Sequence, residues 1–490
     1  MSALGGRIYA ITRTGMAYIS TVEIDPLPPQ RYAEVLKPEA ARILLDVETQ
    51  ARRMYQGRVA WNVNSTATGG GVAEMLRSLL AYARGAGVDA RWAVITGNPE
   101  FFEVTKRIHN QLHNFAGDGG ALGEAERATY ESALEPNAIE LAAMVGRGDV
   151  VLLHDPQTAG LIPSLKRMGV PVVWRCHVGI DVPGEFARKA WRFLIPYVIQ
   201  ADAYVFSRRA FVWEDLDEAK THIIAPSIDA FSPKNRGLDP GTVSAILEAA
   251  GVMRDGTSAS EPVFLRQSGV PARVERRATL FEDQPLLASD RLVLQVSRWD
   301  ALKDPIGVIE GFARYVAPRS DAHLVYAGPA VESVSDDPEG GEILGRAIAC
   351  WNGLAEEQRR RVHLACLPMV DGEENAAIVN ALQRRAYVVV QKSLAEGFGL
   401  TVAEAMWKGK PVVASRIGGI QDQVEDGRTG ILIDDPKDLA RYGEAVLALL
   451  RDPPLASAIG EAAMERVRDH FLGARSLIQY FELFRTLLVA

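Results

Sequence analysis

Short apolar runs that end in polar residues recur along most of the chain. In the first half they are 58–64 (RVAWNVN), 90–96 (ARWAVIT), 149–155 (DVVLLHD), 170–177 (VPVVWRCH) and 201–207 (ADAYVFS). Amphipathic segments separate them; in residues 72–87, for example, the apolar positions have helical spacing. Buried strands that alternate with helices predict a parallel sheet covered on both faces.

A second series of such runs follows a less regular stretch. Between Pro233 and Pro285 the pattern fades and polar residues increase, which is typical of a segment between domains. The runs resume at 291–300 (RLVLQVSRWD), 322–329 (AHLVYAGP), 361–368 (RVHLACLP), 386–393 (AYVVVQKS), 410–419 (KPVVASRIGG) and 430–434 (GILID). We therefore expect two Rossmann-like α/β domains, with ligands bound beyond the carboxyl ends of the strands, in a cleft between the facing halves.

Length and composition agree with this picture. A chain of 490 residues exceeds what one core usually accommodates, and a net charge of −8 argues against a dedicated nucleic-acid binder. The three cysteines, Cys176, Cys350 and Cys366, are scattered, as in proteins of a reducing compartment. The N-terminus does not resemble a signal peptide, and no run approaches the roughly 20 apolar residues that span a bilayer. We expect a cytoplasmic protein with neither nucleic-acid nor membrane partners.

Three consecutive glycines, Gly69, Gly70 and Gly71, connect the first of these strands to its helix. Unpaired amides at a helix N-terminus attract phosphate, and glycines let the backbone approach it closely. The run matches neither the GxGxxG pattern nor the phosphate-binding P-loop. A tight turn that needs positive φ explains the glycines equally well.

Two cations follow the strand that opens the second series. Arg298 and Lys303, in SRWDALKDP, could both reach one diphosphate, the arginine through its planar fork and the lysine as a point charge. Cations are common on protein surfaces, so a solvated loop is the simpler interpretation when this motif is taken alone.

The segment 393–406, SLAEGFGLTVAEAM, combines two carboxylates with a glycine turn. Residues 397–399 form the turn, so Glu396 lies at a strand end and Glu404 about one turn inside the next helix. Amides at the start of that helix would hold an anion. Carboxylates on either side of an anion suit a sugar nucleotide, because one can accept hydrogen bonds from the sugar and the other from the ribose. Without the neighbouring motif, Glu404 could equally be a charge on a helix surface.

The Glu-x7-Glu spacing, with SRWDALKD about a hundred residues upstream, resembles the retaining glycosyltransferases that have two Rossmann-like domains. That family includes sucrose-phosphate, glycogen and trehalose synthases. The segments WNVNSTATGGGVAEML, LLHDPQTAGLIP, WRCHVGID and APSIDAFSPKN narrow the resemblance to trehalose glycosyltransferring synthases and the related retaining trehalose phosphorylases. It covers residues 58–490 and implies an α/β fold of GT-B architecture. The implied parts are an N-terminal extension (1–57), an acceptor domain with linker (58–285), a nucleotide-sugar donor domain (286–460) and C-terminal helices that pack back on the N-terminal domain (461–490).

The resemblance implies a donor site built largely from the second half. Arg298 and Lys303 would bind the diphosphate and stabilise its developing charge, Glu396 would hold hydroxyls of the donor glucosyl group, and Glu404 would hold the ribose. Pro368 and Met369 would lie near the base and contact it through the backbone. The other implied donor contacts are Gly69, Gly70, Gly71, Gly397, Phe398, Gly399, Leu400 and Thr401.

On the acceptor side, the resemblance implies that Asp155 and Gln157 contact the acceptor glucose. His177 would approach the reacting centre and hold a sugar hydroxyl rather than act as a base. Taken without the resemblance, Asp155 caps a turn and His177 is an ordinary strand-end histidine. In the family an acidic residue soon follows the Arg-Cys-His motif, whereas VGID delays Asp181 here. The resemblance is therefore weaker on the acceptor side than on the donor side.

The implied reaction joins a nucleoside-diphosphate glucose to free glucose, reversibly and with retention, and forms trehalose. Front-face attack, with the departing phosphate accepting the proton of the acceptor, needs no nucleophile–base pair. A covalent double displacement would need a carboxylate on the β face, and the sequence offers no candidate. We expect no tightly bound cofactor and no protein metal site, although Mg²⁺ could stimulate the reaction. His109 and His113 have helical i, i+4 spacing but lack further ligands, which favours a solvated helix face.

The sequence leaves three alternatives open. A retaining trehalose phosphorylase would place inorganic phosphate where the diphosphate leaves, and a related glycosyltransferase would use another acceptor. A non-catalytic nucleotide-sugar sensor belongs to a different class, and the presence of all four donor-side charges counts against it. The expected partners are sugars and sugar nucleotides, and the family resemblance suggests a homodimer.

Overall fold

The computed structural model describes residues 8–9, 17–67, 70–254, 259–331 and 338–488. The chain divides into two compact units, Met1–Ser227 together with Gly473–Ala490, and Ile228–Leu472. From the sequence, the main boundary was expected after residue 285 and the returning helices from residue 461. The two descriptions therefore differ in where they assign residues 228–285 and 461–472.

Unit 1 contains an eight-stranded sheet in the order β1-β2-β4-β3-β5-β6-β7-β8. From β4 to β8 all neighbours are parallel, and β2 runs antiparallel to both β1 and β4. Every strand expected between residues 58 and 207 is present. The strands are β1 (Ile8–Tyr9), β2 (Ile19–Val22), β3 (Val59–Asn64), β4 (Asp89–Ile95), β5 (Val150–His154), β6 (Val172–Cys176), β7 (Ala203–Phe206) and β8 (Thr221–Ile223).

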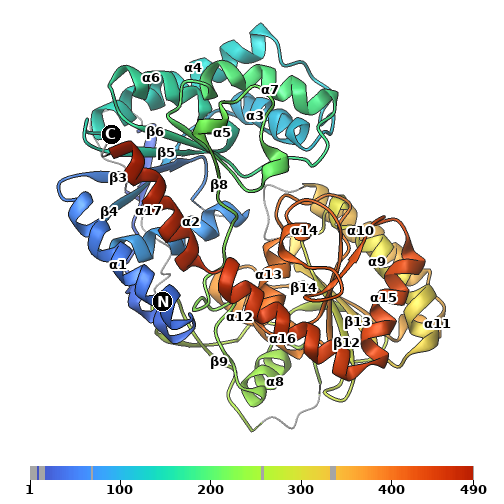
Figure 1. Cartoon of the computed structure of the whole chain (residues 1–490). Helices are drawn as coiled ribbons and strands as arrows, with labels where there is room; N and C mark the ends of the chain where they lie inside the picture. The colour runs from blue at the N-terminus through green and yellow to red at the C-terminus, as the bar shows by residue number, and fades with distance from the viewer. Residues whose placement is uncertain (1–7, 10–16, 68–69, 255–258, 332–337, 489–490) are drawn as a thin grey trace. The chain divides into compact units, whose positions relative to one another are not determined.

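Helices cover both faces of this sheet (Figure 1). One group is α3 (Pro99–Leu112), α4 (Glu124–Met144), α6 (Ile162–Arg167) and α7 (Glu185–Val198); the other is α1 (Pro38–Met54), α2 (Gly70–Gly85) and α17 (Gly473–Leu488). Successive strand residues enter opposite cores, as Leu153 and Leu152 of β5 do. This two-sided burial explains why the strands appear in the sequence as continuous apolar runs.

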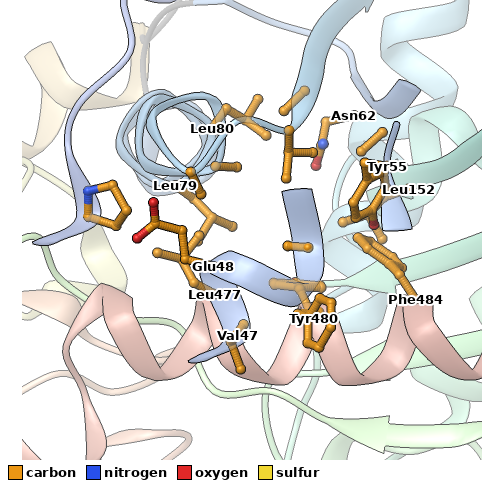
Figure 2. A pocket seen from close by; sticks show the side chains of 18 of the residues that line it. Val47, Glu48, Tyr55, Asn62, Leu79, Leu80, Leu152, Leu477, Tyr480 and Phe484 are labelled. Atoms are coloured by element: carbon orange, nitrogen blue, oxygen red, sulfur yellow. The ribbon is translucent and has the colours of Figure 1, made fainter. Parts of the chain in front are cut away.

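A small apolar cavity lies against α17 in the core of unit 1 (Figure 2). Its volume is about 80 Å³, and its walls include Val47 of α1, Leu79 of α2, Leu152 of β5, and Tyr480 and Phe484 of α17. The C-terminal helix is thus an integral part of the packing of unit 1. Residues in the expected N-terminal extension, including α1 and β2, also belong to this unit.

Unit 2 contains a seven-stranded sheet in the order β11-β14-β13-β12-β15-β16-β17. Only β11 is antiparallel to its neighbour, and the other pairs are parallel. Its strands are β11 (Thr279–Phe281), β12 (Leu292–Val296), β13 (His323–Pro329), β14 (Val362–Leu367), β15 (Val388–Gln391), β16 (Val412–Ser415) and β17 (Ile431–Ile433); a separate hairpin pairs β9 (Val263–Leu265) with β10 (Pro271–Arg273).

The helices of unit 2 surround its sheet (Figure 1). They are α8 (Pro240–Ala249), α9 (Pro305–Gly311), α10 (Pro338–Asn352), α11 (Glu356–Arg359), α12 (Gly372–Arg385), α13 (Leu400–Trp407), α14 (Ile420–Gln423), α15 (Leu439–Arg451) and α16 (Pro453–His470). Two largely parallel sheets with helices on their faces confirm the predicted α/β class with two Rossmann-like domains.

Specific polar contacts tie residues 228–285 to unit 2. The side-chain amide of Asn380 in α12 donates to the carbonyl oxygens of Pro233 and Arg236, each at 2.9 Å. Arg266 forms an ion pair with Asp371 at 2.5 Å. Backbone carbonyls and single charged pairs leave no periodic signal in a sequence, so the hydrophobic pattern alone could not locate this boundary.

The chain passes back to unit 1 between α16 and α17. The hydroxyl of Ser476 donates to that of Ser227 at 2.8 Å, and Arg475 donates to the carbonyl of Ala225 at 2.6 Å.

Within the described part of the chain, no helix is long and apolar enough to cross a membrane.

Candidate active site

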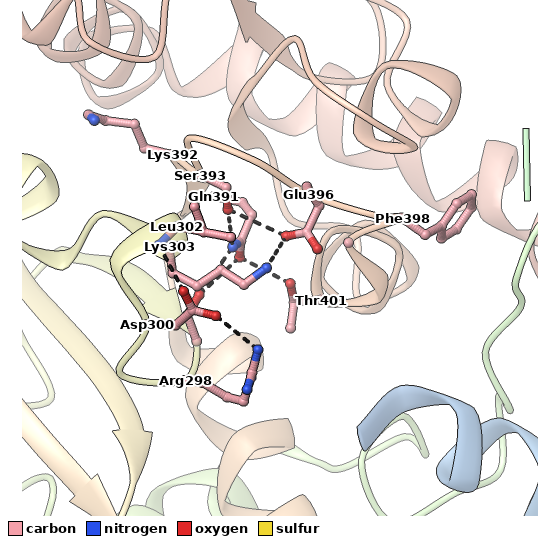
Figure 3. A network of polar contacts seen from close by, with 12 residues as sticks. Arg298, Asp300, Leu302, Lys303, Gln391, Lys392, Ser393, Glu396, Phe398 and Thr401 are labelled. Atoms are coloured by element: carbon pink, nitrogen blue, oxygen red, sulfur yellow. Dashed lines mark hydrogen bonds and ion pairs between the residues drawn. The ribbon is translucent and has the colours of Figure 1, made fainter. Parts of the chain in front are cut away.

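The loops after β12 and β15 bring two of the predicted donor residues, Lys303 and Glu396, into contact. Nζ of Lys303 lies 2.6 Å from Oε2 of Glu396, although the residues are 93 positions apart (Figure 3). Their side chains are 17% and 11% exposed, so solvent screens the pair only partly. β12 and β15 are adjacent parallel strands, and their carboxyl ends therefore meet at one edge of the sheet.

A buried set of amides and hydroxyls holds these two loops together. The side-chain amide of Gln391, the last residue of β15, donates to the hydroxyls of Ser297 at 3.1 Å and Ser393 at 2.9 Å (Figure 3). Its carbonyl oxygen accepts from the hydroxyl of Thr401 at 3.0 Å, which links the strand to α13. Because each of these buried groups has a partner, the network fixes the path of both loops.

Gln295 fixes the backbone on the other side of Lys303. From β12 its side-chain amide donates to the carbonyl of Lys303 at 2.9 Å, while its oxygen accepts from the backbone amide of Lys392 at 3.2 Å. Sequence reasoning did not single out Gln295, Gln391 or Ser393. The available signal was a polar residue at the end of an otherwise apolar strand, as in VVVQKS.

Arg298 occupies a more open position than Lys303. Its guanidinium donates to Asp300 at 2.9 Å, and its side chain is 65% exposed. The other oxygen of Asp300 accepts from the backbone amide of Leu302 at 2.8 Å and so caps the short 3-10 helix Ala301–Lys303. Asp300 therefore shapes the loop and orients the arginine.

A second lysine in this region, Lys392, has a structural role. Lys392 is buried and pairs with Asp304, which has a left-handed backbone (φ 50°) and caps α9 through the amide of Gly307 at 3.1 Å. The buried charge of Lys392 is thereby compensated within the protein. Of the two lysines, only Lys303 points its ammonium group at Glu396.

The glycine turn before α13 has a close backbone neighbour. Gly399 adopts φ 80° at the start of the helix, and the amide of Gly419 donates to the carbonyl of Gly397 at 2.9 Å. A Cβ atom on Gly418, which has φ 47°, would lie 1.8 Å from the carbonyl oxygen of Glu396. Gly418 is therefore required for the Glu396 loop to pack against the loop after β16, a role that sequence reasoning missed.

Phe398 and Leu400, two of the predicted donor residues at this turn, differ in the groups that they can present to a ligand. Phe398 turns its ring away from Lys303 (Figure 3) and packs on Phe471, with ring centroids 5.9 Å apart. Its ring is therefore engaged in packing within unit 2. Leu400 begins α13 with its amide at the helix start, where unpaired N–H groups attract anions.

Glu404 is not a charge on the helix surface. It is buried in α13, and its carboxylate forms an ion pair with Lys234 at 3.5 Å. Lys408, one turn later, donates to the side chain of Asn235 at 3.0 Å and to the carbonyl of Glu404 at 3.1 Å; burial holds the pKa of this lysine well below its ordinary value. The segment containing residues 234 and 235 therefore packs against the carboxylate that the resemblance assigned to the ribose.

Pro368 and Met369 follow β14 at the same edge of the sheet and are half-buried. The carbonyl of Pro368 accepts from the side-chain amide of Asn375 in α12 at 3.0 Å. This contact anchors the backbone at the position expected near the nucleotide base.

In unit 1, the predicted acceptor residues Asp155 and His177 are joined directly. The backbone amide of His177 donates to Oδ1 of Asp155 at 2.8 Å, and the indole of Trp174 donates to the carbonyl of Asp155 at 3.1 Å. Asp155 has a left-handed backbone (φ 65°) and begins the short helix α5 (Asp155–Thr158), which also carries the half-buried Gln157. Hydrogen bonds thus join the polar residues at the ends of β5 and β6.

The glycine run lies at the end of β3 in the same unit. Gly70 and Gly71 begin α2, so they occupy the helix N-terminus that the sequence predicted. Gly69 lies outside the described residues. In the described ranges no cluster of three or more His, Cys, Asp or Glu residues could hold a metal ion.

Burial of Asp155 leads to a pH-dependent prediction. Burial raises the pKa of its carboxyl group from 3.8 to about 6, against the smaller opposing effects of the hydrogen bond from the His177 amide and the charge of Arg175. A raised carboxyl pKa means that the folded state binds the proton more tightly than the unfolded state. The stabilising contribution is therefore fully present below pH 3.8 and declines as pH rises through about 6.

The variant Asp155→Asn keeps an oxygen that can accept from His177 but never ionises. We therefore expect the Tm difference, variant minus wild type, to increase as pH rises from about 4 to about 7. Thermal unfolding of both proteins across this range measures it. A difference that does not change with pH would contradict the raised pKa.

Comparison with known proteins agrees with the geometry. Residues 62–213 match the model of the trehalose synthase N-terminal domain, and residues 277–466 match that of glycosyl transferases group 1. The chain is 34% identical to a trehalose synthase of Pyrococcus horikoshii over 90% of this chain and 92% of that protein, and 36% identical to one of Rubrobacter xylanophilus over 90% and 94%. A trehalose phosphorylase of Grifola frondosa is 26% identical over 83% of this chain and 54% of its own length.

The fold is also found among solved structures. An α,α-trehalose-phosphate synthase (UDP-forming) from Burkholderia vietnamiensis superposes with a TM-score of 0.64 at 15% identity, over 88% of this chain and 99% of that one. At this identity the match concerns the fold alone, and it confirms the predicted GT-B class.

Proposed function

Because this chain belongs to the trehalose synthase family and is a trehalose-related glycosyltransferase, we propose that it forms trehalose from a nucleoside-diphosphate glucose and free glucose. The observation that carries the proposal is the Lys303–Glu396 pair, with Arg298 on the same loop as the lysine. An ammonium group that already lies against a carboxylate can bind an anion while the carboxylate binds the sugar attached to that anion.

In this proposal unit 2 binds the donor. Lys303 and Arg298 neutralise the diphosphate together with the N-terminal amides of α13, at Leu400 and Thr401. Glu396 accepts hydrogen bonds from hydroxyls of the glucosyl group. Glu404 accepts hydrogen bonds from the ribose, and its carboxylate then contacts both Lys234 and the ligand.

The proposed chemistry breaks the bond between the anomeric carbon and the leaving phosphate oxygen, on the face where the new bond forms. The acceptor hydroxyl oxygen attacks from that same face, and its proton passes to the leaving phosphate. Configuration is then retained without a protein nucleophile. Negative charge accumulates on the diphosphate in the transition state, and fixed cations such as Lys303 stabilise it there more than in the ground state.

Unit 1 would bind the acceptor glucose through Asp155, Gln157 and His177, and its glycines at the start of α2 would border the reacting sugar. The proposed reaction uses no tightly bound cofactor. We also propose that the protein acts as a homodimer in the cytoplasm.

The test is incubation with ADP-, UDP- or GDP-glucose, each with and without free glucose. The proposal requires nucleotide release that depends on glucose and is matched by trehalose formed. Nucleotide release with another sugar but not with glucose would show a different acceptor. Thermal stabilisation by a nucleotide sugar with no turnover would indicate a sensor.

A phosphorylase is the second candidate, because the chain is also similar to trehalose phosphorylases. In that reaction inorganic phosphate would occupy the place of the leaving diphosphate. Glucose 1-phosphate formed from trehalose and phosphate, with no turnover of any nucleotide sugar, would replace the first proposal by the second.

A further inference from the structure

Four polar side chains form a continuous row from the middle of β3 to the carboxyl ends of β5 and β6. Nε of Arg175 donates to Nδ1 of His177 at 3.2 Å, and Nε2 of His177 lies 3.1 Å from Nδ1 of His154. Nε2 of His154 lies 3.1 Å from Oδ1 of Asn62. Of the four, only His177 was predicted from the sequence as a site residue.

The arginine at one end fixes the direction of every hydrogen bond in this row. A guanidinium group only donates, so Nδ1 of His177 accepts and the ring proton of His177 resides on Nε2. That proton is donated to Nδ1 of His154, which therefore carries its own proton on Nε2. The proton of His154 is in turn donated to the oxygen of Asn62.

Other protonation states place two donors face to face. If His177 were an imidazolium ion, its Nδ1–H would oppose the N–H of Arg175, and an imidazolium at His154 would oppose the N–H of His177. If the amide of Asn62 were rotated, it would donate to His154 and force the proton of His154 toward His177. The donor-only arginine therefore determines even the amide orientation at the far end of the row.

The surroundings favour the same neutral state. Burial lowers the pKa of His154 to about 3 and holds that of His177 well below its ordinary value, and the charge of Arg175 adds to both effects. The two rings lie nearly parallel, with centroids 5.4 Å apart and an interplanar angle of 17°. His154 is 1% exposed, so it can act on a substrate only through His177.

We propose that Arg175, His154 and Asn62 are positioning residues that hold His177 as the neutral Nε2–H tautomer at the end of β6. The inference rests on the proposed transfer to an acceptor bound beside His177. It assigns both ring nitrogens of His177, because the proton on Nε2 is donated to His154 and the lone pair on Nδ1 accepts from Arg175. His177 therefore has no ring lone pair with which to serve as a base.

The first test is direct observation of the ring tautomers. In protein labelled with ¹⁵N in its histidines, long-range ¹H–¹⁵N correlation spectra at neutral pH should show His154 and His177 as neutral rings protonated at Nε2. An Nδ1–H tautomer or an imidazolium at either position would overturn the proposal. This measurement needs no substrate, so a protein inactive with every nucleotide sugar but showing both Nε2–H rings would refute the proposed function and leave the tautomer assignment standing.

The second test compares two variants of His154. In His154→Asn the side-chain oxygen can accept from His177 in place of Nδ1, whereas His154→Leu offers no acceptor. We expect the leucine variant to lose about tenfold in kcat, because it lacks the hydrogen bond that orients the ring of His177. The asparagine variant should recover most of that loss. Equal kcat values for the two variants would overturn the positioning role.

His363→Leu supplies a matched control. His363 pairs with His323 in unit 2 at 3.0 Å, with ring centroids 5.3 Å apart, so its loss removes a similar buried histidine pair. The control should change Tm without altering the His177 tautomer or kcat. The variant Arg175→Met adds an independent measurement: a second tautomer of His177 should appear in its spectra, and a single unchanged tautomer would contradict the assignment of the arginine.

Discussion

Replacing Lys303 with methionine should lower kcat for glucosyl transfer by about 100- to 1,000-fold, the range seen when one preorganised electrostatic group is removed from an active site. The ammonium group lies at the carboxyl end of β12 in a partly enclosed position, where its charge is only partly screened by solvent. The effect should fall mainly on kcat, because the charge of the leaving diphosphate grows as the anomeric bond breaks. Steady-state kinetics with the nucleotide sugar identified by the donor screen measures it.

A matched lysine shows whether loss of an ion pair alone explains the result. Lys166 pairs with Asp202 at 2.7 Å with both side chains about 30% exposed, and it lies in unit 1 away from the strand ends that carry the site. Lys166→Met should leave kcat within about twofold, because removing such a partly exposed pair affects mainly stability. A decrease in kcat of similar size in both variants would exclude a specific role for Lys303.

Glu396→Gln should lower kcat/KM by about 10- to 100-fold, the factor expected when a hydrogen bond to a charged acceptor is replaced by one to a neutral group. The amide is nearly isosteric with the carboxylate, so the shape of the turn before α13 is retained. The change removes the negative partner of Lys303 and the charged acceptor for sugar hydroxyls. Kinetics with glucosyl and deoxyglucosyl donors separates these effects, since a donor that lacks the contacted hydroxyl should be insensitive to the substitution.

The double variant Lys303→Met/Glu396→Gln tests whether the two residues act as one unit. Their atoms are in contact, so their effects on kcat/KM should combine to less than the product of the single effects. Full multiplicativity would mean that each residue acts on the substrate without regard to the other. Asp202→Asn, alone and with Lys166→Met, provides the corresponding control cycle.

The hydrophobic pattern was sufficient to predict the central parallel strands because these are buried on both faces, whereas β2, β8 and β11 were not predicted. Runs such as DVVLLHD and AYVVVQKS correspond to β5 and β15, and the polar residues that end them lie at the strand ends expected of binding residues. The boundary near residue 228 was not predictable in the same way. It depends on hydrogen bonds such as those from Asn380 to the carbonyls of Pro233 and Arg236, to which periodicity is insensitive.

The candidate site shows the same division. Arg298, Lys303 and Glu396 were predicted as donor residues because their residue types and spacing indicate phosphate and sugar binding. Gln391 and Gly418 were missed, because one acts through hydrogen bonds to Ser297 and Thr401 and the other through the absence of a side chain beside the carbonyl of Glu396. Their importance depends on which loops become neighbours.

The sequence by itself determined the two α/β domains, the order of the strands along the chain and the chemical types of the residues at their carboxyl ends. Apolar runs and charge spacing are local properties, and they survive in a sequence without reference to distant partners. Only the tertiary structure decided that Lys303 contacts Glu396, that Lys234 contacts Glu404, and that Arg175 sets the proton positions along a row reaching Asn62. A hydrogen bond extends over about 3 Å, whereas these partners lie up to 170 positions apart, so only the folded sheet order brings them together.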